Sequence, residues 1–229
     1  MFVRYALRTT DAPAARDFYR RALGLELPDG RSEDTSLEAW PLHERAIAAG
    51  APAHWLGQLA VADLDVEVER WVARGARPLG PTVRSDAGAW ATLADPWGAV
   101  VALRSGGDEP SDRPVRWHQL HTTAQADAWS LYGESGGWVD QGNVDAADPV
   151  GGFRLFGGDD GPVGAVANTA RWEGVHAHWL FHFPVDDLDA ALARVRELGG
   201  TAMEPRSLAY RRLGACEDPQ GAAFGLVAG

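Results

Sequence analysis

The sequence predicts an α+β protein of two domains, each built from two β-α-β-β-β modules. The first observation is an internal repeat: "HWLGQLAVADLD" at 54–65 and "HWLFHFPVDDLD" at 178–189 share seven of twelve residues. The second is that "LRTTDAPAARDFYRRALGL" at 7–25 aligns with "LHTTAQADAWSLYGESGGW" at 120–138. The third is that a "DPWG" and a "DPQG" sequence each precede the last apolar run of a copy. Two copies of two modules account for all three observations.

The module that opens each copy begins with a short alternating strand and continues into a helix. "RYALRT" is expected as a strand, "APAARDFYRRAL" as a helix and Gly24 as its end. "WHQLHT" and "QADAWSLYGES" repeat this order, with the helix end at Gly136 and Gly137. Glycine favours a helix end because it adopts the left-handed conformation without a steric cost.

The module that closes each copy places aspartates between a strand and a helix. "LGQLAV" is followed by Asp63, Asp65 and a helix to Gly75, and "LFHFPV" by three aspartates and a helix to Gly199. Aspartate favours a helix start because its carboxylate accepts the free N–H groups of the first turn. The last helix carries an apolar stripe made of Leu188, Ala191, Leu192, Val195 and Leu198. Short strands and the DPxG turn complete each module.

The two copies differ in length, because their offset grows from 113 to 124 residues, which leaves about eleven extra residues between 138 and 178. "GGFRLFGGDDGPVGAV" in that segment is expected as two strands joined by a turn. Residues 106–114 are polar and rich in proline and glycine, as is typical of a linker. The predicted domains are therefore 1–105 and 115–229.

The composition limits the kind of partner that the chain binds. A net charge of −11 argues against nucleic acid or an anionic membrane surface, because both require a basic patch. No apolar run reaches the roughly 20 residues that span a bilayer, and the N-terminal residues lack a long apolar run, so we do not expect a signal peptide. A single cysteine, Cys216, is expected to be buried and unreactive. We expect a cytoplasmic protein, either a monomer or a homodimer, with a small-molecule ligand.

The motif "D-x-x-A-A-x-x-F-Y-x-x-x-L-G", which begins at Asp11, resembles the vicinal oxygen chelate superfamily. "V-x-D-L-D" before a helix and "DPxG" before the last strand are similar to the same superfamily, which contains glyoxalase I, bleomycin-resistance proteins and extradiol dioxygenases. The second copy most resembles two-domain glyoxalase-like proteins. The resemblance implies curled mixed sheets that form cups. It also implies a divalent metal, held by His, Gln and Glu side chains, that polarises vicinal oxygens of a substrate.

The positions that hold metal ligands in this superfamily carry unsuitable side chains here. The resemblance assigns these positions to Arg4, Leu56, Ala102, Trp117, Leu180 and Gly225. None of these side chains donates an electron pair to a divalent ion. A shift of one residue would bring His118 to a ligand position, but it would also turn the strand inside out. We therefore predict that the superfamily's metal site is lost and that no cofactor is bound.

Strand alternation predicts a polar lining on the cup faces. The predicted ligand-binding residues are Arg4, Arg8, His54, Gln58, Trp117, Gln119, His121, His178 and His182. Arginines would hold a carboxylate or phosphate, and His121 or His182 would act as a general acid or base if the protein is an enzyme. His121, His176 and His178 form the alternative, a divalent metal site, because a His-x-His pair binds zinc when a third ligand approaches.

The ten tryptophans suggest a pocket for a planar ligand. Strand alternation places Trp55 and Trp179 towards the helices, in the core. The better candidates for a pocket lining are Trp40, Trp90, Trp117 and Trp172.

Two functions follow from these features. The first is a metal-independent binding protein of the glyoxalase and bleomycin-resistance type, with an aromatic or hydrophobic metabolite or antibiotic in its cup. The alternative is a lyase, isomerase or oxidoreductase that uses a noncanonical histidine site in the second domain. In a third interpretation, the first domain serves only as a structural partner.

Overall fold

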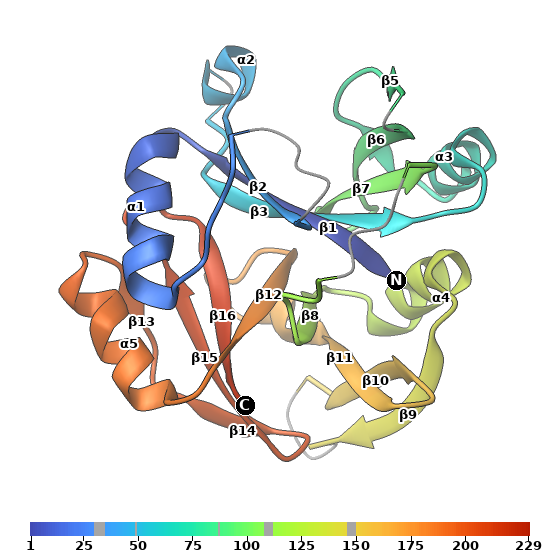
Figure 1. Cartoon of the computed structure of the whole chain (residues 1–229). Helices are drawn as coiled ribbons and strands as arrows, with labels where there is room; N and C mark the ends of the chain where they lie inside the picture. Colours follow the sequence, from blue (N-terminus) through green and yellow to red (C-terminus); the bar gives the residue numbers. More distant parts are fainter. Residues whose placement is uncertain (30–34, 49, 87, 108–111, 146–149) are drawn as a thin grey trace. The chain divides into compact units, whose positions relative to one another are not determined.

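The computed structural model describes residues 1–29, 35–48, 50–86, 88–107, 112–145 and 150–229 (Figure 1). The first sheet has the open strand order β2-β1-β3-β7-β6-β4, with β5 paired to β6. Its strands are β1 Phe2–Thr9, β2 Leu37–Pro41, β3 His54–Ala60, β4 Arg77–Pro78, β5 Val83–Ser85, β6 Gly88–Ala94 and β7 Val100–Ser105.

The second sheet has the open order β13-β15-β16-β12-β8-β11-β10-β9, with β14 paired to β15. Its strands are β8 Trp117–His121, β9 Val139–Val144, β10 Phe153–Gly158, β11 Gly161–Ala167, β12 His178–Val185, β13 Thr201–Ala202, β14 Arg206–Leu208, β15 Arg211–Glu217 and β16 Ala223–Ala228. The predicted pair of strands within 151–166 is confirmed as β10 and β11, which pair antiparallel. Both sheets mix parallel and antiparallel pairs, so the predicted α+β fold class is confirmed.

The helices that close each copy begin where the aspartates predict them. The helices of the described residues are α1 Ala12–Leu23, α2 Glu44–Ala48, α3 Leu64–Ala73, α4 Gln125–Gly136 and α5 Leu188–Glu197, with a 3₁₀ turn at Asn168–Arg171. Asp11 caps α1 by accepting from the N–H of Ala14 at 3.0 Å, and Gly24 ends that helix at φ 68°. Asp63 and Asp187 cap α3 and α5 in the same way. α4 lacks a side-chain cap of its own; instead Asn168 accepts from its first N–H, that of Gln125, at 2.8 Å.

The first module is abbreviated relative to the predicted β-α-β-β-β order. Among the described residues between α1 and β3, only β2 is a strand, and it pairs parallel to β1. The following segment, "LHERAIAAGAPA", contains the short helix α2 instead of a further strand. Alanine, glutamate and arginine favour a helix over an extended conformation, which explains this difference.

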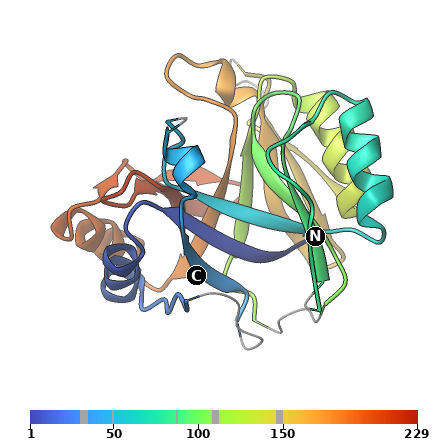
Figure 2. The same cartoon turned by 90° about the horizontal axis from the view of Figure 1, so that it is seen from above.

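Contacts divide the chain into two compact units, and each unit takes segments from both halves of the sequence. Unit 1 comprises Met1–Arg4, Gly57–Glu109 and His118–Trp179. Unit 2 comprises Tyr5–Leu56, Pro110–Trp117 and Leu180–Gly229. Within unit 1, α3 lies beside α4, and within unit 2, α1 lies beside α5 (Figure 1 and Figure 2). The predicted division at residues 106–114 stays a prediction, and residues 108–111 lie outside the described part of the chain.

The core of unit 2 contains a cluster of Trp55, Tyr19 and Asp218. The indole Nε1 of Trp55 donates to the Tyr19 hydroxyl at 2.9 Å, and the two rings meet edge to face. The Asp218 carboxylate lies beside that hydroxyl, while its Oδ1 accepts from the N–H groups of Gln220 and Ala222. Burial, followed by the charge of Asp218, raises the pKa of Tyr19 well above its usual value. This arrangement stabilises the DPxG turn against helix α1.

Unit 1 contains the equivalent cluster, made of Trp179, Tyr132 and Asp95. The Tyr132 hydroxyl donates to Asp95 Oδ2 at 3.0 Å, and the ring meets Trp179 edge to face. Asp95 Oδ1 accepts from two N–H groups of its own DPxG turn. The residues that the two copies share therefore build the same Trp–Tyr–Asp cluster twice, once in each unit. As predicted, Trp55 and Trp179 are core residues.

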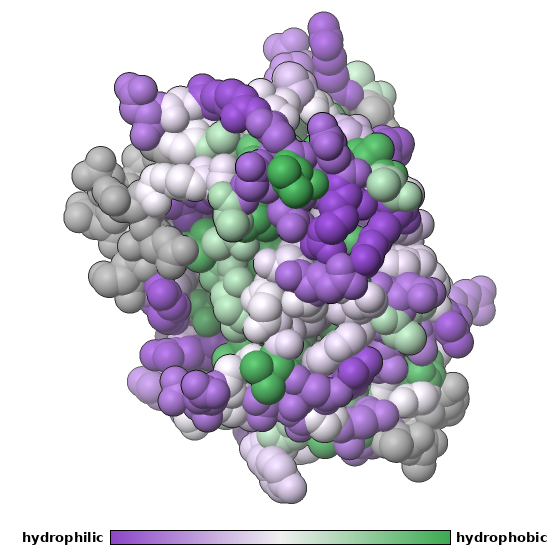
Figure 3. All heavy atoms as spheres, turned by 90° about the vertical axis from the view of Figure 1, so that its right-hand side faces the viewer, coloured by the Kyte–Doolittle hydropathy of each residue, from purple (hydrophilic) through white to green (hydrophobic). Residues whose placement is uncertain are grey.

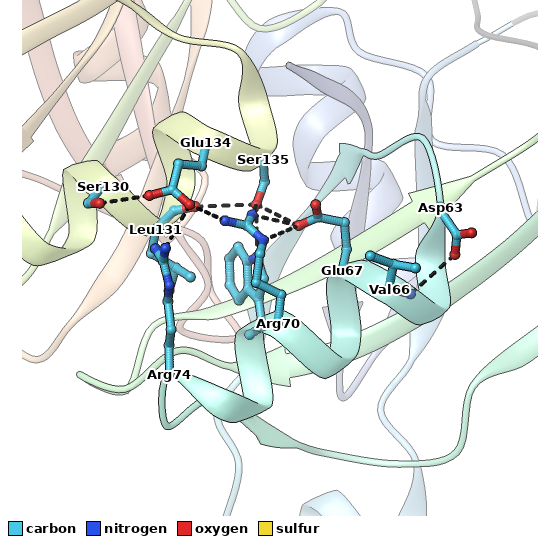
Figure 4. A network of polar contacts seen from close by, with 10 residues as sticks. Asp63, Val66, Glu67, Arg70, Arg74, Ser130, Leu131, Glu134 and Ser135 are labelled. Atoms are coloured by element: carbon cyan, nitrogen blue, oxygen red, sulfur yellow. Dashed lines mark hydrogen bonds and ion pairs between the residues drawn. The ribbon is translucent and has the colours of Figure 1, made fainter.

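A polar network joins α3 to α4 in unit 1 (Figure 4). Arg70 contacts Glu67 on its own helix and reaches Glu134 and Ser135 on α4. Arg74 donates to the same Glu134 carboxylate at 2.7 Å. Because these side chains are partly exposed, their ion pairs contribute little individually, and the network mainly fixes how the two helices pack.

One face of the chain is mainly hydrophilic. Hydrophilic residues cover most of the face drawn in Figure 3, and strongly hydrophobic residues are separate spots on it. Within the described residues, no helix is long and apolar enough to cross a membrane.

Candidate functional site

The second sheet contains three of the positions that hold metal ligands in the superfamily that this sequence resembles. They are Trp117 on β8, Leu180 on β12 and Gly225 on β16. Trp117 and Leu180 are buried, and their side chains carry no atom that binds a divalent ion. The register between β12 and β16 sets His182 opposite Gly225, so both share one face of the sheet. These positions therefore lie in the core of unit 2 as a mainly aromatic and apolar group.

The ring of His182 occupies the space in which a side chain at position 225 would begin. A Cβ atom built on Gly225 would lie 2.1 Å from Cδ2 and 2.5 Å from Nε2 of His182. His182 is 2% exposed, and its Nδ1 lies 3.3 Å from the carbonyl oxygen of Trp117. A glutamate, which the superfamily places here, would clash with this ring. The donor set of unit 2 does not fit the superfamily's metal.

The first sheet has the corresponding positions at Arg4, Leu56 and Ala102. All three are buried. Gln58 lies opposite Ala102 in the register between β3 and β7, and it is buried too. Leu56 and Ala102 offer only carbon atoms, and an arginine does not donate a lone pair, so these positions do not fit a metal either.

Two buried charged residues of the first sheet were missed by the sequence reasoning. Glu38 on β2 lies opposite Ala6, and Arg104 on β7 lies opposite Ala60. Each is at most 4% exposed. Their only sequence signal is a charge inside a short apolar strand, which does not distinguish a buried residue from one at a strand edge.

Unit 1 gathers the remaining predicted polar residues of the second copy into a histidine cluster, made of Gln119, His121, Thr169, His176 and His178. His121 Nδ1 lies 2.5 Å from the Thr169 hydroxyl, and its Nε2 lies 3.3 Å from Gln119 Nε2. The rings of His121 and His178 stack at 4.5 Å with an 11° angle between their planes. Thr169, which follows β11, was not predicted.

Hydrogen bonding sets the protonation of His178. Its Nδ1 donates to the carbonyl oxygen of His176 at 2.9 Å, because a carbonyl only accepts. Burial lowers the pKa of His178, and this hydrogen bond partly opposes that effect. The ring is therefore neutral near pH 7, with the lone pair on Nε2. Such an atom can accept a proton or a hydrogen bond from a ligand.

The geometry does not support the alternative metal site at His121, His176 and His178. Imidazole lone pairs lie in the ring plane, so those of the parallel His121 and His178 rings do not converge on one point. One nitrogen of each ring is also engaged by a protein atom. Throughout the described ranges, no three His, Cys, Asp or Glu side chains are grouped to hold an ion.

Arg8, Trp40 and His54 meet in unit 2. The guanidinium of Arg8 lies over the Trp40 ring, 5.8 Å from its centroid. His54 Nδ1 lies 2.9 Å from the carbonyl oxygen of Pro52, and burial, with a smaller effect of the Arg8 charge, lowers the pKa of His54.

The remaining candidates differ in burial. His118 is buried on the ring of Phe2, and its Nδ1 contacts the carbonyl of Val163, so it does not offer a ligand position. Cys216 is buried, as predicted, and burial raises the pKa of its thiol to about 12. Trp90 on β6 lies opposite Arg104 on β7, and Trp172 follows the 3₁₀ turn. Both tryptophans are half-buried.

An open groove of about 550 Å³ lies elsewhere in unit 2, after α1. None of the predicted binding residues lines it. Its lining is mainly apolar with two carboxylates, and includes Leu25, Glu26, Leu27, Leu37 and Asp112.

The chain belongs to the Glyoxalase/Bleomycin resistance protein/Dioxygenase superfamily, whose family model matches residues 106–226. A second model, the Glyoxalase-like domain, matches residues 4–103. The resemblance to this superfamily is thus confirmed.

Relatives carry different names. The chain is 29% identical to "Putative glyoxylase CFP32" of Mycobacterium bovis, over 96% of this chain and 92% of that protein. It is 32% identical to "Anthracycline biosynthesis protein DauV" of Streptomyces sp., over 78% of this chain and 66% of that protein. Among solved structures, the Mn(II)-bound glyoxalase of Novosphingobium aromaticivorans matches with a TM-score of 0.67 and 13% identity, over 99% of this chain and 81% of that one. At this identity the match shows the shared fold.

Proposed function

We propose that this chain is a metal-independent member of the superfamily that binds an aromatic or hydrophobic small molecule, a metabolite or an antibiotic. The observation that carries the proposal is the His182 ring over Gly225. The His182 ring fills the volume that a glutamate side chain would need, and Gly225 supplies no carboxylate to a metal. The buried Trp117 and Leu180 on the neighbouring strands replace the other donors with apolar surface.

The aromatic and apolar side chains at these positions favour a planar ligand. Flat aromatic side chains stack on flat ligands, and a few polar groups then fix the orientation. Two relatives are named for anthracycline biosynthesis, and anthracyclines are polycyclic aromatic compounds. This agrees with an aromatic ligand class for the present chain.

A direct test combines metal analysis with ligand screening. The chain is expressed with Mn, Fe, Ni and Zn in the medium, purified without chelator and measured by elemental mass spectrometry. We expect no stoichiometric metal, and a rise of the thermal midpoint with polycyclic aromatic compounds, since a ligand selective for the folded state stabilises it. One metal per chain would overturn the proposal.

The second candidate function is an enzyme that uses the histidine cluster. The chain of contacts from Gln119 through His121 to Thr169 orients a titratable ring, as a general acid or base requires. In this case a bound aromatic compound is converted, which mass spectrometry detects. His121→Ala then abolishes conversion, whereas His176→Ala, at an exposed position of the same cluster, retains it.

A further inference from the structure

Arg211 lies on the same sheet face as His182 and Gly225. The register between β15 and β16 sets Ala215 opposite Gly225, and strand alternation then puts Leu213 and Arg211 on that face. The opposite face is covered by α5, because a Cβ on Gly214 would lie 2.7 Å from Leu192. Arg211 therefore points away from the helix, to the face that contains the superfamily's Glu position.

The turn before Arg211 is unusual. Leu208 pairs with Arg211, so Ala209 and Tyr210 alone form the turn between β14 and β15. Both adopt positive φ angles, 49° and 67°, which L-residues rarely adopt and which glycine or asparagine would favour. The short turn makes Arg211 the first residue of β15 and limits the positions its side chain can reach.

The guanidinium of Arg211 lies on Trp117, with Cζ 5.5 Å from the ring centroid. A guanidinium over an aromatic ring is held by the cation–π interaction, while its in-plane N–H groups stay available to an acceptor. Arg211 has no carboxylate partner among the described residues. The adjacent Arg212 differs, because it donates to both carboxylate oxygens of Asp189 on α5.

Trp117 supplies a second donor. Its side chain is fully buried, and its Nε1–H has no acceptor within the described part of the chain. A buried N–H without an acceptor costs free energy, so such a group favours the binding of an acceptor, which a ligand or a water can supply. An unpaired cation and an unpaired buried N–H thus meet at a position where relatives hold a metal ligand.

We propose that Arg211 and Trp117 bind the carboxylate of a planar aromatic acid, and that the guanidinium supplies the positive charge that a metal supplies in the superfamily. The guanidinium matches a carboxylate in a two-point contact, and the indole N–H donates to one of its oxygens. The ring of the ligand then lies over the half-buried Ala215 on the same face, with the buried Leu180 and Leu213 as its neighbours. This inference rests on the proposed function and names its ligand class.

The test uses the full-length chain with 2-naphthoate and its uncharged analogue 2-naphthamide, measured by isothermal titration calorimetry. We expect 2-naphthoate to bind the wild type, and R211Q to weaken that binding about tenfold or more, as expected for a lost charge-assisted contact. R212Q is the matched control and retains wild-type affinity. W117F keeps an aromatic ring under Arg211 but removes the N–H, so it weakens the binding of both compounds, because the naphthamide carbonyl oxygen also accepts a hydrogen bond.

Three results would overturn the inference: no binding of 2-naphthoate to the wild type, equal affinity for the acid and the amide, or equal effects of R211Q and R212Q. Circular dichroism and thermal melting of each variant exclude a folding defect as the cause. A stoichiometric metal in the purified chain would overturn the proposed function instead. The two failures are therefore distinguished by separate measurements.

Discussion

Replacing Gly225 by alanine tests the close approach of His182 directly. The new Cβ would lie 2.1 Å from Cδ2, 2.3 Å from Cγ and 2.5 Å from Nε2 of the ring. Carbon atoms in contact are normally separated by about 3.5–4.0 Å, so the ring must move by more than about 1 Å. His182 is 2% exposed and its surroundings are filled, so this movement disturbs the core.

The expected destabilisation follows from overpacking. Adding a methyl group to a filled core costs about 1–3 kcal/mol, and alanine regains about 0.5–1 kcal/mol over glycine in a strand. For a chain of this length, each kcal/mol lowers the thermal midpoint by about 2–4 °C. The substitution should therefore lower the midpoint by several degrees.

Thermal and urea unfolding of Gly225→Ala should be compared with those of Gly158→Ala. Gly158 is also a strand residue, and its added Cβ would meet no atom within 4 Å. We expect the control to stabilise the chain by about 0.5–1 kcal/mol or less, because only the gain of alanine over glycine remains there. In a His182→Ala background, Gly225→Ala should cost almost nothing, which gives a coupling energy of about 1–3 kcal/mol between the two positions.

Equal midpoints for Gly225→Ala and Gly158→Ala would refute this reasoning. So would an unchanged cost of Gly225→Ala after His182 is removed. Either result would mean that the ring does not occupy the space above position 225.

Three further predictions concern unit 1. Tyr132→Phe leaves a buried oxygen of Asp95 without its donor and should lower the free energy of unfolding by about 1–3 kcal/mol in urea. Burial lowers the pKa of His118 to about 4, so the unfolded chain takes up a proton between pH 6.5 and 4 that the folded chain excludes. As the pH is lowered through this range, the free energy of unfolding should decrease by about 1.4 kcal/mol per pH unit. His118→Gln should remove that contribution from a pH series of urea melts. Arg70→Ala should cost about 1 kcal/mol or less, with the loss shrinking in high salt; an unchanged cost in salt would contradict an ionic role.

The local signals in the sequence predicted the secondary structure well. Asp63 and Asp187 mark helix starts, and Gly24 marks a helix end, because capping depends on neighbouring residues alone. The abbreviated first module was not predicted, since its alanine-rich segment was assigned by analogy with the other modules.

The site was only partly predictable. The side chains at the superfamily's ligand positions could be named from the resemblance, and strand alternation predicts which other residues share a face with them. A glycine inside a strand signals a close approach, but the sequence does not say that His182 fills the space over Gly225. Likewise, the contact of Arg211 with Trp117 joins residues far apart in the chain and needs the register of β15 to be recognised.

The two Trp–Tyr–Asp clusters have a consequence for the chain's autonomy. Tyr19 and Trp55 belong to the first sequence half, and Asp218 belongs to the second. Conversely, Asp95 belongs to the first half, and Tyr132 and Trp179 belong to the second. A cut between the two sequence halves would therefore leave both Trp–Tyr–Asp clusters incomplete, because each cluster takes residues from both fragments.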